Sequence, residues 1–179
     1  EAAGQGYIAG VNAALSIFDR EVFTLSRNES YIGVMIEDLI SNLRDEPYRL
    51  FTARSENRLY IREDNSIIRL HAKRQSLGLE MAVDKFNSQF IKVYNVMFGL
   101  LKEYYVDNSH GFIKNSDLKL PRRMSVSELL KQSKVDPVHL AKEFFNFMGI
   151  SISEALIWCL AVSNKYEGYI NKSAEHNER

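Results

Sequence analysis

The chain has 179 residues, 45% of them hydrophobic and 11% aromatic, so it is long enough to bury one substantial core. Lysine plus arginine and aspartate plus glutamate are equal at 23 each, so the total charge indicates no nucleic-acid partner and any basic surface is local. The single cysteine, Cys159, excludes an internal disulfide and a cysteine-based metal site, and no apolar stretch approaches the roughly 20 residues that span a bilayer, which predicts no membrane partner.

The first predicted helix covers Ala2–Ile17, and small residues recur at every fourth position along it. These residues are Ala2, Gly6, Gly10 and Ala14. Because a glycine inside a helix costs about 1 kcal/mol relative to alanine, the stripe predicts close approach to a sheet or ligand, including one outside this chain. Gly4 and Gly6 also loosely resemble a dinucleotide-binding loop, but no strand precedes them, so close packing is favoured and cofactor proximity is the alternative.

The chain begins at Glu1 without an N-terminal cap, so its start is interpreted as a cut inside a larger protein.

The second predicted helix follows Ser30, whose hydroxyl is a typical N-cap. It ends before Pro47, because the residue that precedes a proline is disfavoured in a helix. A further helix is predicted for Phe51–Arg62, and a short strand around Leu59 and Ile61 is the alternative for this segment.

The rest of the chain is also predicted to be helical. The expected helices are residues 67–77, ended by Gly78; residues 79–106; residues 127–131, capped by Ser125 or Ser127; residues 137–148, capped by Asp136; and residues 153–174. An extended loop is predicted for residues 107–123. The expected fold class is therefore mainly α, with little signal for strands.

Arginine is concentrated in one part of the chain, because seven of the twelve arginines lie between residues 44 and 74. That segment has eight basic and five acidic residues, a net charge of +3 in a neutral chain. If Phe51–Arg62 is helical, then Arg54, Arg58 and Arg62 lie along one side, where guanidinium groups can bind phosphates. Charge pattern alone favours instead a solvated face with local ion pairs. The pairs expected in that case are Arg54 with Glu56 and Arg58 with Glu63.

Residue types that carry catalysis do not form a recognisable site in the sequence. The histidines are His71, His110, His139 and His176, which are too scattered to give a metal-binding spacing. No arrangement of a nucleophile with a histidine and an acid can be singled out. We therefore predict no catalytic residue and no metal ligand in this chain.

Four runs of sequence carry a resemblance to a known family. They are residues 1–14 (EAAGQGYIAGVNAA), 27–39 (RNESYIGVMIEDL), 46–65 (EPYRLFTARSENRLYIREDN) and 165–170 (KYEGYI). In this order they resemble the glucose-inhibited division protein A family, the flavin-dependent tRNA uridine 5-carboxymethylaminomethyl modification enzymes. The first run resembles the last helix of the family's FAD-binding domain. The resemblance therefore assigns residues 1–18 to that truncated domain and residues 19–179 to a helical C-terminal tRNA-binding region.

The resemblance implies an enzyme that uses FAD and NADH to build a carboxymethylaminomethyl group on carbon 5 of the tRNA wobble uridine. It further implies a folate as the source of the one-carbon unit, a GTPase partner, a homodimer, and a location in the cytoplasm or in an organelle such as the mitochondrion. The family's cofactor loop and catalytic cysteines would lie upstream of Glu1, so the fragment alone is expected to be inactive and to bind no cofactor. A distal helical tail that docks the GTPase is absent, so this partner is not expected to bind the fragment.

By the same resemblance, Arg49, Arg54, Arg58 and Arg62 map to the family's basic surface implicated in tRNA binding, which reverses the preference given by charge pattern alone. Contacts from two positions are not carried over: Asn57 stands where the family has a tyrosine, and Asn171-Lys172 stands where it has an arginine. Two alternatives remain. One is a helical protein-interaction module with internally paired arginines, and the other, which the missing strand and glycine loop disfavour, is a flavoprotein complete in itself.

Overall fold

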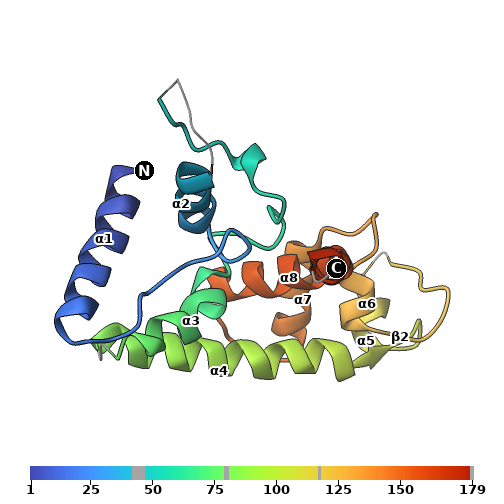
Figure 1. Ribbon diagram of the computed structural model, residues 1–179. Coiled ribbons are helices and arrows are strands. Elements are labelled where there is room, and N and C mark those ends of the chain that lie inside the picture. Colours follow the sequence, from blue (N-terminus) through green and yellow to red (C-terminus); the bar gives the residue numbers. More distant parts are fainter. Residues whose placement is uncertain (42–46, 79–80, 117, 178–179) are drawn as a thin grey trace. The chain divides into compact units, whose positions relative to one another are not determined.

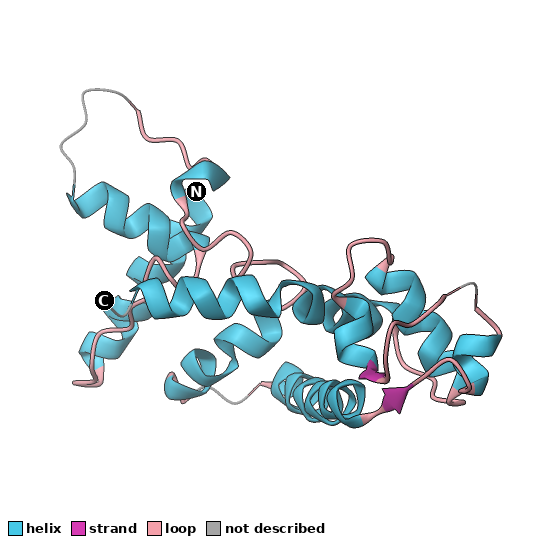
Figure 2. Ribbon diagram, turned by 90° about the vertical axis from the view of Figure 1, so that its right-hand side faces the viewer, coloured by secondary structure: helices cyan, strands magenta, loops and turns pink. Residues whose placement is uncertain are grey.

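The structure is a computed structural model that describes residues 1–41, 47–78, 81–116 and 118–177. Its described elements are helices and turns apart from two strands of two residues each, so the predicted mainly α class is confirmed (Figures 1 and 2). No helix among the described residues is both long and apolar enough to cross a membrane. The chain divides into two compact units, Glu1–Glu80 and Met81–Arg179, which are described separately. The assignment of residues 1–18 to a flavin-binding domain stays a prediction.

The N-terminal unit contains three helices and one short 3₁₀ turn among its described residues. They are α1 (Ala2–Ile17), α2 (Tyr31–Ser41), the turn Thr52–Arg54 and α3 (Ser66–Ser76). Helices α1 and α2 lie side by side (Figure 1), and a Cβ atom on Gly4 would lie 3.3 Å from the Met35 Cε atom. The predicted stripe of small residues is exposed instead, and a Cβ atom on Gly6 or Gly10 would meet no atom of the described chain within 4 Å. Among the glycines of α1, the close approach to the described chain is therefore made at Gly4.

Helix α2 begins where its capping chemistry predicts. The backbone N–H of Gly33 donates to the Ser30 hydroxyl at 2.9 Å, so the predicted N-cap is confirmed. The predicted end of this helix before Pro47 falls on residues 42–46, which lie outside the described residues. Gly33 also faces the backbone of the preceding connector, where a Cβ atom would lie 2.0 Å from the Ser26 carbonyl oxygen.

The prediction of a helix for Phe51–Arg62 is wrong, and so is the alternative of a strand. The segment forms the short turn Thr52–Arg54 and then further turns up to Ile61. The reason is tertiary, because Arg27 binds both the Glu56 carboxylate and a backbone carbonyl of the segment. These contacts with a distant part of the chain outweigh the modest helix propensity of the segment.

The C-terminal unit contains the remaining described elements. They are α4 (Ala82–Glu103), β1 (Tyr105–Val106), α5 (Gly111–Lys114), β2 (Met124–Ser125), α6 (Val126–Leu130), α7 (Pro137–Phe147) and α8 (Glu154–Asn177). The helix predicted up to residue 106 ends at Glu103, because Tyr105 and Val106 pair with Ser125 and Met124 in an antiparallel ladder. The loop predicted for residues 107–123 contains α5.

Two predicted caps in this unit are confirmed. The Ser125 hydroxyl accepts the N–H of Glu128 and the Glu128 carboxylate accepts the N–H of Ser125, which forms a capping box for α6. Asp136 caps α7 ahead of Pro137. The caps orient helices around one apolar core, whose fully buried members include Phe144, Phe145, Leu129, Leu130 and Leu160.

The KYEGYI run of α8 joins three parts of the C-terminal unit. The Glu167 carboxylate accepts hydrogen bonds from Lys102 of α4 and from Lys131 at the end of α6, both at 2.6 Å. Partial burial works against ionisation of Glu167, but the two lysines outweigh it and hold the pKa of this carboxyl below its usual value.

We expect Glu167→Gln to lower the thermal midpoint at pH 7 by about 2 °C, a small change because the ion pairs are partly exposed. A carboxyl with a lowered folded-state pKa contributes stability above its ordinary value of 4.5, and the contribution is lost as the pH falls. Melting followed by circular dichroism should therefore show the gap between wild type and variant closing below about pH 4.5. The control is Glu154→Gln, whose carboxylate is 86% exposed and whose loss should change the midpoint little. A gap that persists at pH 3 would contradict the expectation.

Candidate nucleic-acid interface

The four predicted tRNA-contacting arginines lie on residues 47–62, which we call the basic segment. Arg49 and Arg58 are exposed, whereas Arg54 and Arg62 are half-buried. The segment is not helical, so the four do not share one side of a helix as predicted. Their surroundings divide them into two pairs.

Arg54 is bound by its own unit. Its Nε atom donates to the Arg49 carbonyl at 3.2 Å, and its Nη1 atom lies 3.6 Å from an Asp38 carboxylate oxygen. The guanidinium also lies over the Tyr48 ring, 5.4 Å from its centroid. Asp38 is only 6% exposed and accepts a further hydrogen bond from the Tyr48 hydroxyl at 3.2 Å. A buried carboxylate held in this way needs its cation, so Arg54 shapes the basic segment.

Arg62 is bound just as firmly. Its Nε and Nη2 atoms donate to the two carboxylate oxygens of Asp64, each at 2.9 Å, in the bidentate geometry that suits a guanidinium. Its Nη1 atom donates to the Leu59 carbonyl at 2.7 Å, and its own carbonyl accepts a bond from Arg69 at 3.0 Å. Arg62 therefore closes the turn that leads into α3.

Arg27 holds the middle of the basic segment, although sequence reasoning gave it no role. Its Nε and Nη2 atoms bind the Glu56 carboxylate at 3.1 and 2.9 Å, and its Nη1 atom binds Glu37 of α2 at 3.1 Å. The hydrogen bonds to Glu56 and Glu37 raise the pKa of Arg27 above its usual value, and the bond from Arg27 lowers the pKa of Glu56. The only sequence signal for this role is that Arg27 opens the second family run, RNESYIG.

We expect Arg27→Ala to lower the thermal midpoint by roughly 3–6 °C, because it leaves Glu37, Asp38 and Glu56 without a shared cation. Differential scanning calorimetry of the variant tests this. Arg122→Ala is the matched control, since Arg122 pairs with Glu128 on an exposed surface and its removal should shift the midpoint by less than about 1 °C. Equal shifts in the two variants would contradict a special role for Arg27.

Arg49 and Arg58 differ from the other two arginines. Neither side chain forms a hydrogen bond or an ion pair within the part of the chain that the structure describes. The backbone at Arg49 is held, because the Leu50 N–H donates to the Glu1 carboxylate at 2.6 Å and the Arg49 carbonyl accepts the bond from Arg54. The turn that contains Arg58 is closed by the Tyr60 N–H, which donates to the Asn57 carbonyl at 2.9 Å. Two exposed guanidinium groups on a fixed backbone are suited to bind phosphates.

The local ion pairs that charge pattern favoured are not among those formed by the described residues. Arg54 is bound to Asp38 and Glu56 to Arg27, while no bond joins Arg58 to Glu63 in the described chain. Asn57, where the resemblance led us to expect a tyrosine, is 6% exposed and donates to the Asn28 side chain at 2.8 Å. This position is therefore part of the interior of the N-terminal unit.

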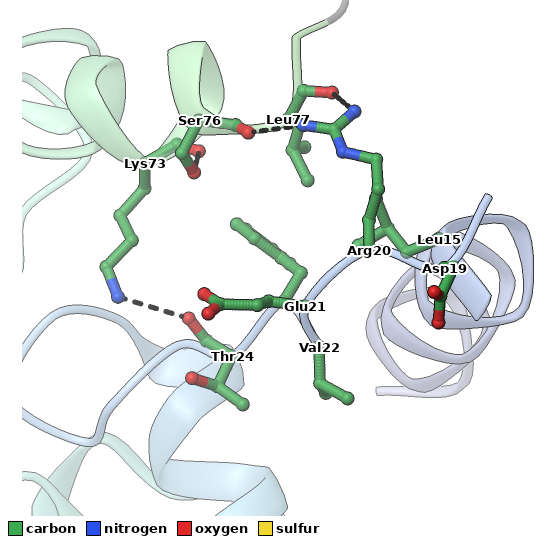
Figure 3. A pocket seen from close by; sticks show the side chains of 10 residues that line it. Leu15, Asp19, Arg20, Glu21, Val22, Thr24, Lys73, Ser76 and Leu77 are labelled. Atoms are coloured by element: carbon green, nitrogen blue, oxygen red, sulfur yellow. Dashed lines mark hydrogen bonds between the residues drawn. The ribbon is translucent and has the colours of Figure 1, made fainter.

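A pocket of about 580 Å³ lies in the N-terminal unit between the end of α1, the following connector and the end of α3 (Figure 3). Its cations are directed at backbone carbonyls: Arg20 donates to Leu77 and Ser76 at 2.8 and 3.0 Å, and Lys73 donates to Thr24 at 3.3 Å. Bound in this way, the two cations do not form a phosphate site, so the basic segment is the stronger candidate for an RNA contact.

A metal site and a dinucleotide site each require a particular arrangement of residues. No group of three or more histidine, cysteine or acidic side chains in the described chain is placed to bind a metal ion. A dinucleotide site needs a strand, a glycine loop and a helix in succession. Gly4, Gly6 and Gly10 lie inside α1, and both described strands belong to the other unit. The described residues therefore contain no succession of strand, glycine loop and helix of this kind.

Comparison with known proteins identifies the family. No family model matches the chain. The tRNA uridine 5-carboxymethylaminomethyl modification enzyme MnmG of Sulfurihydrogenibium sp. (strain YO3AOP1) is 37% identical over 182 residues, which cover 100% of this chain and 27% of that protein. MnmG of Aquifex aeolicus (strain VF5) is 39% identical over 180 residues, covering 100% of this chain and 28% of that protein. The chain belongs to the MnmG family.

The structure agrees with this result. The form II crystal structure of Aquifex aeolicus GidA matches 99% of this chain and 28% of its own chain, with a TM-score of 0.78 at 36% identity. The mainly α fold described above is thus that of the C-terminal region of GidA. The chain spans just over a quarter of the length of the MnmG relatives that it matches.

Proposed function

We propose that this chain is the tRNA-contacting part of an MnmG-type tRNA uridine-modifying enzyme, with Arg49 and Arg58 as its phosphate contacts. The observation that carries the proposal is the division of the basic segment into two bound and two exposed arginines. Arg54 and Arg62 then act as positioning residues that hold the segment against its own unit. Of the four predicted tRNA-binding arginines, the proposal therefore keeps Arg49 and Arg58 as contacts and gives Arg54 and Arg62 a supporting task.

The complete protein would add a carboxymethylaminomethyl group to carbon 5 of the wobble uridine, with FAD and NADH bound outside this chain. The chain itself would be inactive, and its task would be to hold the stem and loop of the anticodon arm so that the uridine, turned out of its stack, reaches the flavin site. A GTPase partner, a homodimer and a cytoplasmic or mitochondrial location are proposed on the family resemblance alone.

The salt dependence of tRNA binding tests the proposal. A phosphate-binding surface releases counterions, so the logarithm of the affinity should fall linearly with the logarithm of the salt concentration, with a slope of about −1 for each phosphate contact. Fluorescence anisotropy with a labelled tRNA between about 50 and 300 mM KCl, roughly a sixfold range of salt concentration, measures the slope. Binding that does not change with salt, or no binding at 50 mM, would overturn the proposal.

A helical protein-interaction module is the second candidate. The internal binding of Arg54 and Arg62 is what that reading predicts, and α1 presents Ile17 and its neighbour Phe18 to solvent at 80% and 73% exposure. Light scattering of the chain in the absence of tRNA distinguishes the two candidates. An interaction module should form a dimer or a defined protein complex in that sample.

A further inference from the structure

The basic segment also exposes aromatic rings. Phe51 is 55% exposed and Tyr60 is 38% exposed, although the adjacent Ile61 is buried at 4%. Single exposed apolar residues are common on protein surfaces. These two, however, lie two residues from the exposed Arg49 and Arg58 respectively. Aromatic rings among basic residues are the combination with which proteins bind single-stranded nucleic acid, since every base has a face that can stack.

A guanidinium lies beside each of these rings. The Arg54 Cζ atom lies over the Phe51 ring, 5.9 Å from its centroid, and the Arg69 Cζ atom lies over the Tyr60 ring at the same distance. Both guanidiniums are held in place by other residues of the unit. Arg54 is held by the contacts given above, and Arg69 donates hydrogen bonds to the Asn65 side chain at 3.3 Å and to the Arg62 carbonyl at 3.0 Å. Each ring therefore has a cation over one face, and a base can add to the stack on the opposite face.

The backbone that carries the rings is also held. Phe51 is the N-cap of the turn Thr52–Arg54, and its carbonyl accepts the Arg54 N–H at 3.0 Å. The Tyr60 N–H donates to the Asn57 carbonyl at 2.9 Å, and the Tyr60 carbonyl accepts the Asn65 side chain at 2.8 Å. A ring on a held backbone has only two side-chain torsions to order, so little conformational entropy opposes stacking.

We propose that Phe51 and Tyr60 stack on unpaired bases of the bound RNA while Arg49 and Arg58 bind the adjoining phosphates. This inference rests on the proposed function and extends it, because it names the ligand as a single-stranded stretch of nucleotides. A duplex keeps its bases stacked on one another and offers the rings nothing to stack on. The basic segment should therefore prefer an RNA loop to an RNA duplex of equal charge.

The test uses two RNA probes of equal length, a stem-loop with an open loop and a blunt duplex. Phe51→Leu keeps an apolar side chain but removes the ring, and Tyr60→Leu does the same at the second position. Each variant should bind the stem-loop about 5- to 100-fold more weakly than wild type, the range expected for one stacked base, and should bind the duplex unchanged. The salt slope should also stay unchanged, because no phosphate contact is lost.

Two matched variants complete the design. Tyr60→Phe keeps the ring and should bind the stem-loop like wild type, and Phe86→Leu removes a 63% exposed ring of α4 and should have no effect. Circular dichroism melts establish that each variant is folded. An independent signal comes from Phe51→Trp with Trp158→Phe, which leaves one tryptophan whose fluorescence should be quenched by the stem-loop and not by the duplex.

The outcomes separate the two proposals. Unchanged stem-loop binding in Phe51→Leu and Tyr60→Leu, or equal weakening for both probes, overturns the stacking inference and leaves the phosphate contacts standing. Wild-type chain that binds neither probe overturns the proposed function and the inference with it. Quenching by the duplex as strong as quenching by the stem-loop also overturns the inference.

Discussion

Replacing Arg49 and Arg58 together with alanine is expected to weaken tRNA binding by about 10- to 100-fold at low salt, since each charged hydrogen bond to phosphate contributes on the order of 1 kcal/mol or more. The slope of log affinity against log salt should become shallower by about 2. The thermal midpoint should change by less than about 1 °C, because neither side chain has a partner in the described chain. Anisotropy titrations and calorimetry on the same samples measure both quantities.

Two comparisons decide whether a loss of binding is specific. Lys85→Ala with Lys92→Ala removes two exposed charges from α4 and should leave tRNA affinity within about twofold of wild type. Arg54→Ala should weaken binding too, but with a lower thermal midpoint, because it leaves the carboxylate of Asp38 poorly compensated. If the lysine pair matters as much as the arginine pair, or if Arg49 and Arg58 can be removed without effect, the basic segment is not the RNA contact.

Replacing Gly33 with alanine is expected to destabilise the N-terminal unit by more than about 3 kcal/mol. The new Cβ atom would lie 2.0 Å from the Ser26 carbonyl oxygen and 2.6 Å from the Leu25 carbonyl oxygen. These are backbone atoms, and the Ser26 oxygen already accepts the N–H groups of Glu29 and Ser30 at 3.0 and 3.2 Å. The connector therefore cannot yield without losing the hydrogen bonds that lead into α2. Urea unfolding followed by circular dichroism measures the change.

Glycines elsewhere provide the control for this prediction. Gly99 in α4 and Gly168 in α8 have no atom of the described chain within 4 Å of the position where a Cβ atom would stand. Alanine at either position should stabilise the protein by up to about 1 kcal/mol, because it improves helix propensity without an overlap. A Gly33→Ala protein as stable as these two variants would show that the close approach at Gly33 is relieved by a small shift of the connector.

The family assignment and the N-caps of several helices were accessible from the sequence for different reasons. Four runs of residues identified the family, and 33–39% identity to MnmG relatives confirms it. Ser30 and Asp136 were predicted as caps and Ser125 as one of two candidate caps, because these side chains act on backbone N–H groups two or three residues away. Such chemistry is local and can be read from the order of residues. The assignment of a tRNA-contacting role to the basic segment stays a proposal.

Tertiary contacts alone decided the structure of the basic segment and the division of its arginines. The local sequence of the segment favours a helix. Arg27, nearly 30 residues from Glu56 in the sequence, binds the Glu56 carboxylate and so holds the segment as a series of turns. Asp38 likewise holds Arg54 from a different part of the chain, and the ladder of Tyr105 with Ser125 ends α4 earlier than its periodicity indicates. The sequence by itself therefore determined the helical class, the caps and the family. Only the folded chain decided which arginines are bound inside the unit and which reach solvent, because that depends on which distant carboxylates come within a few ångströms.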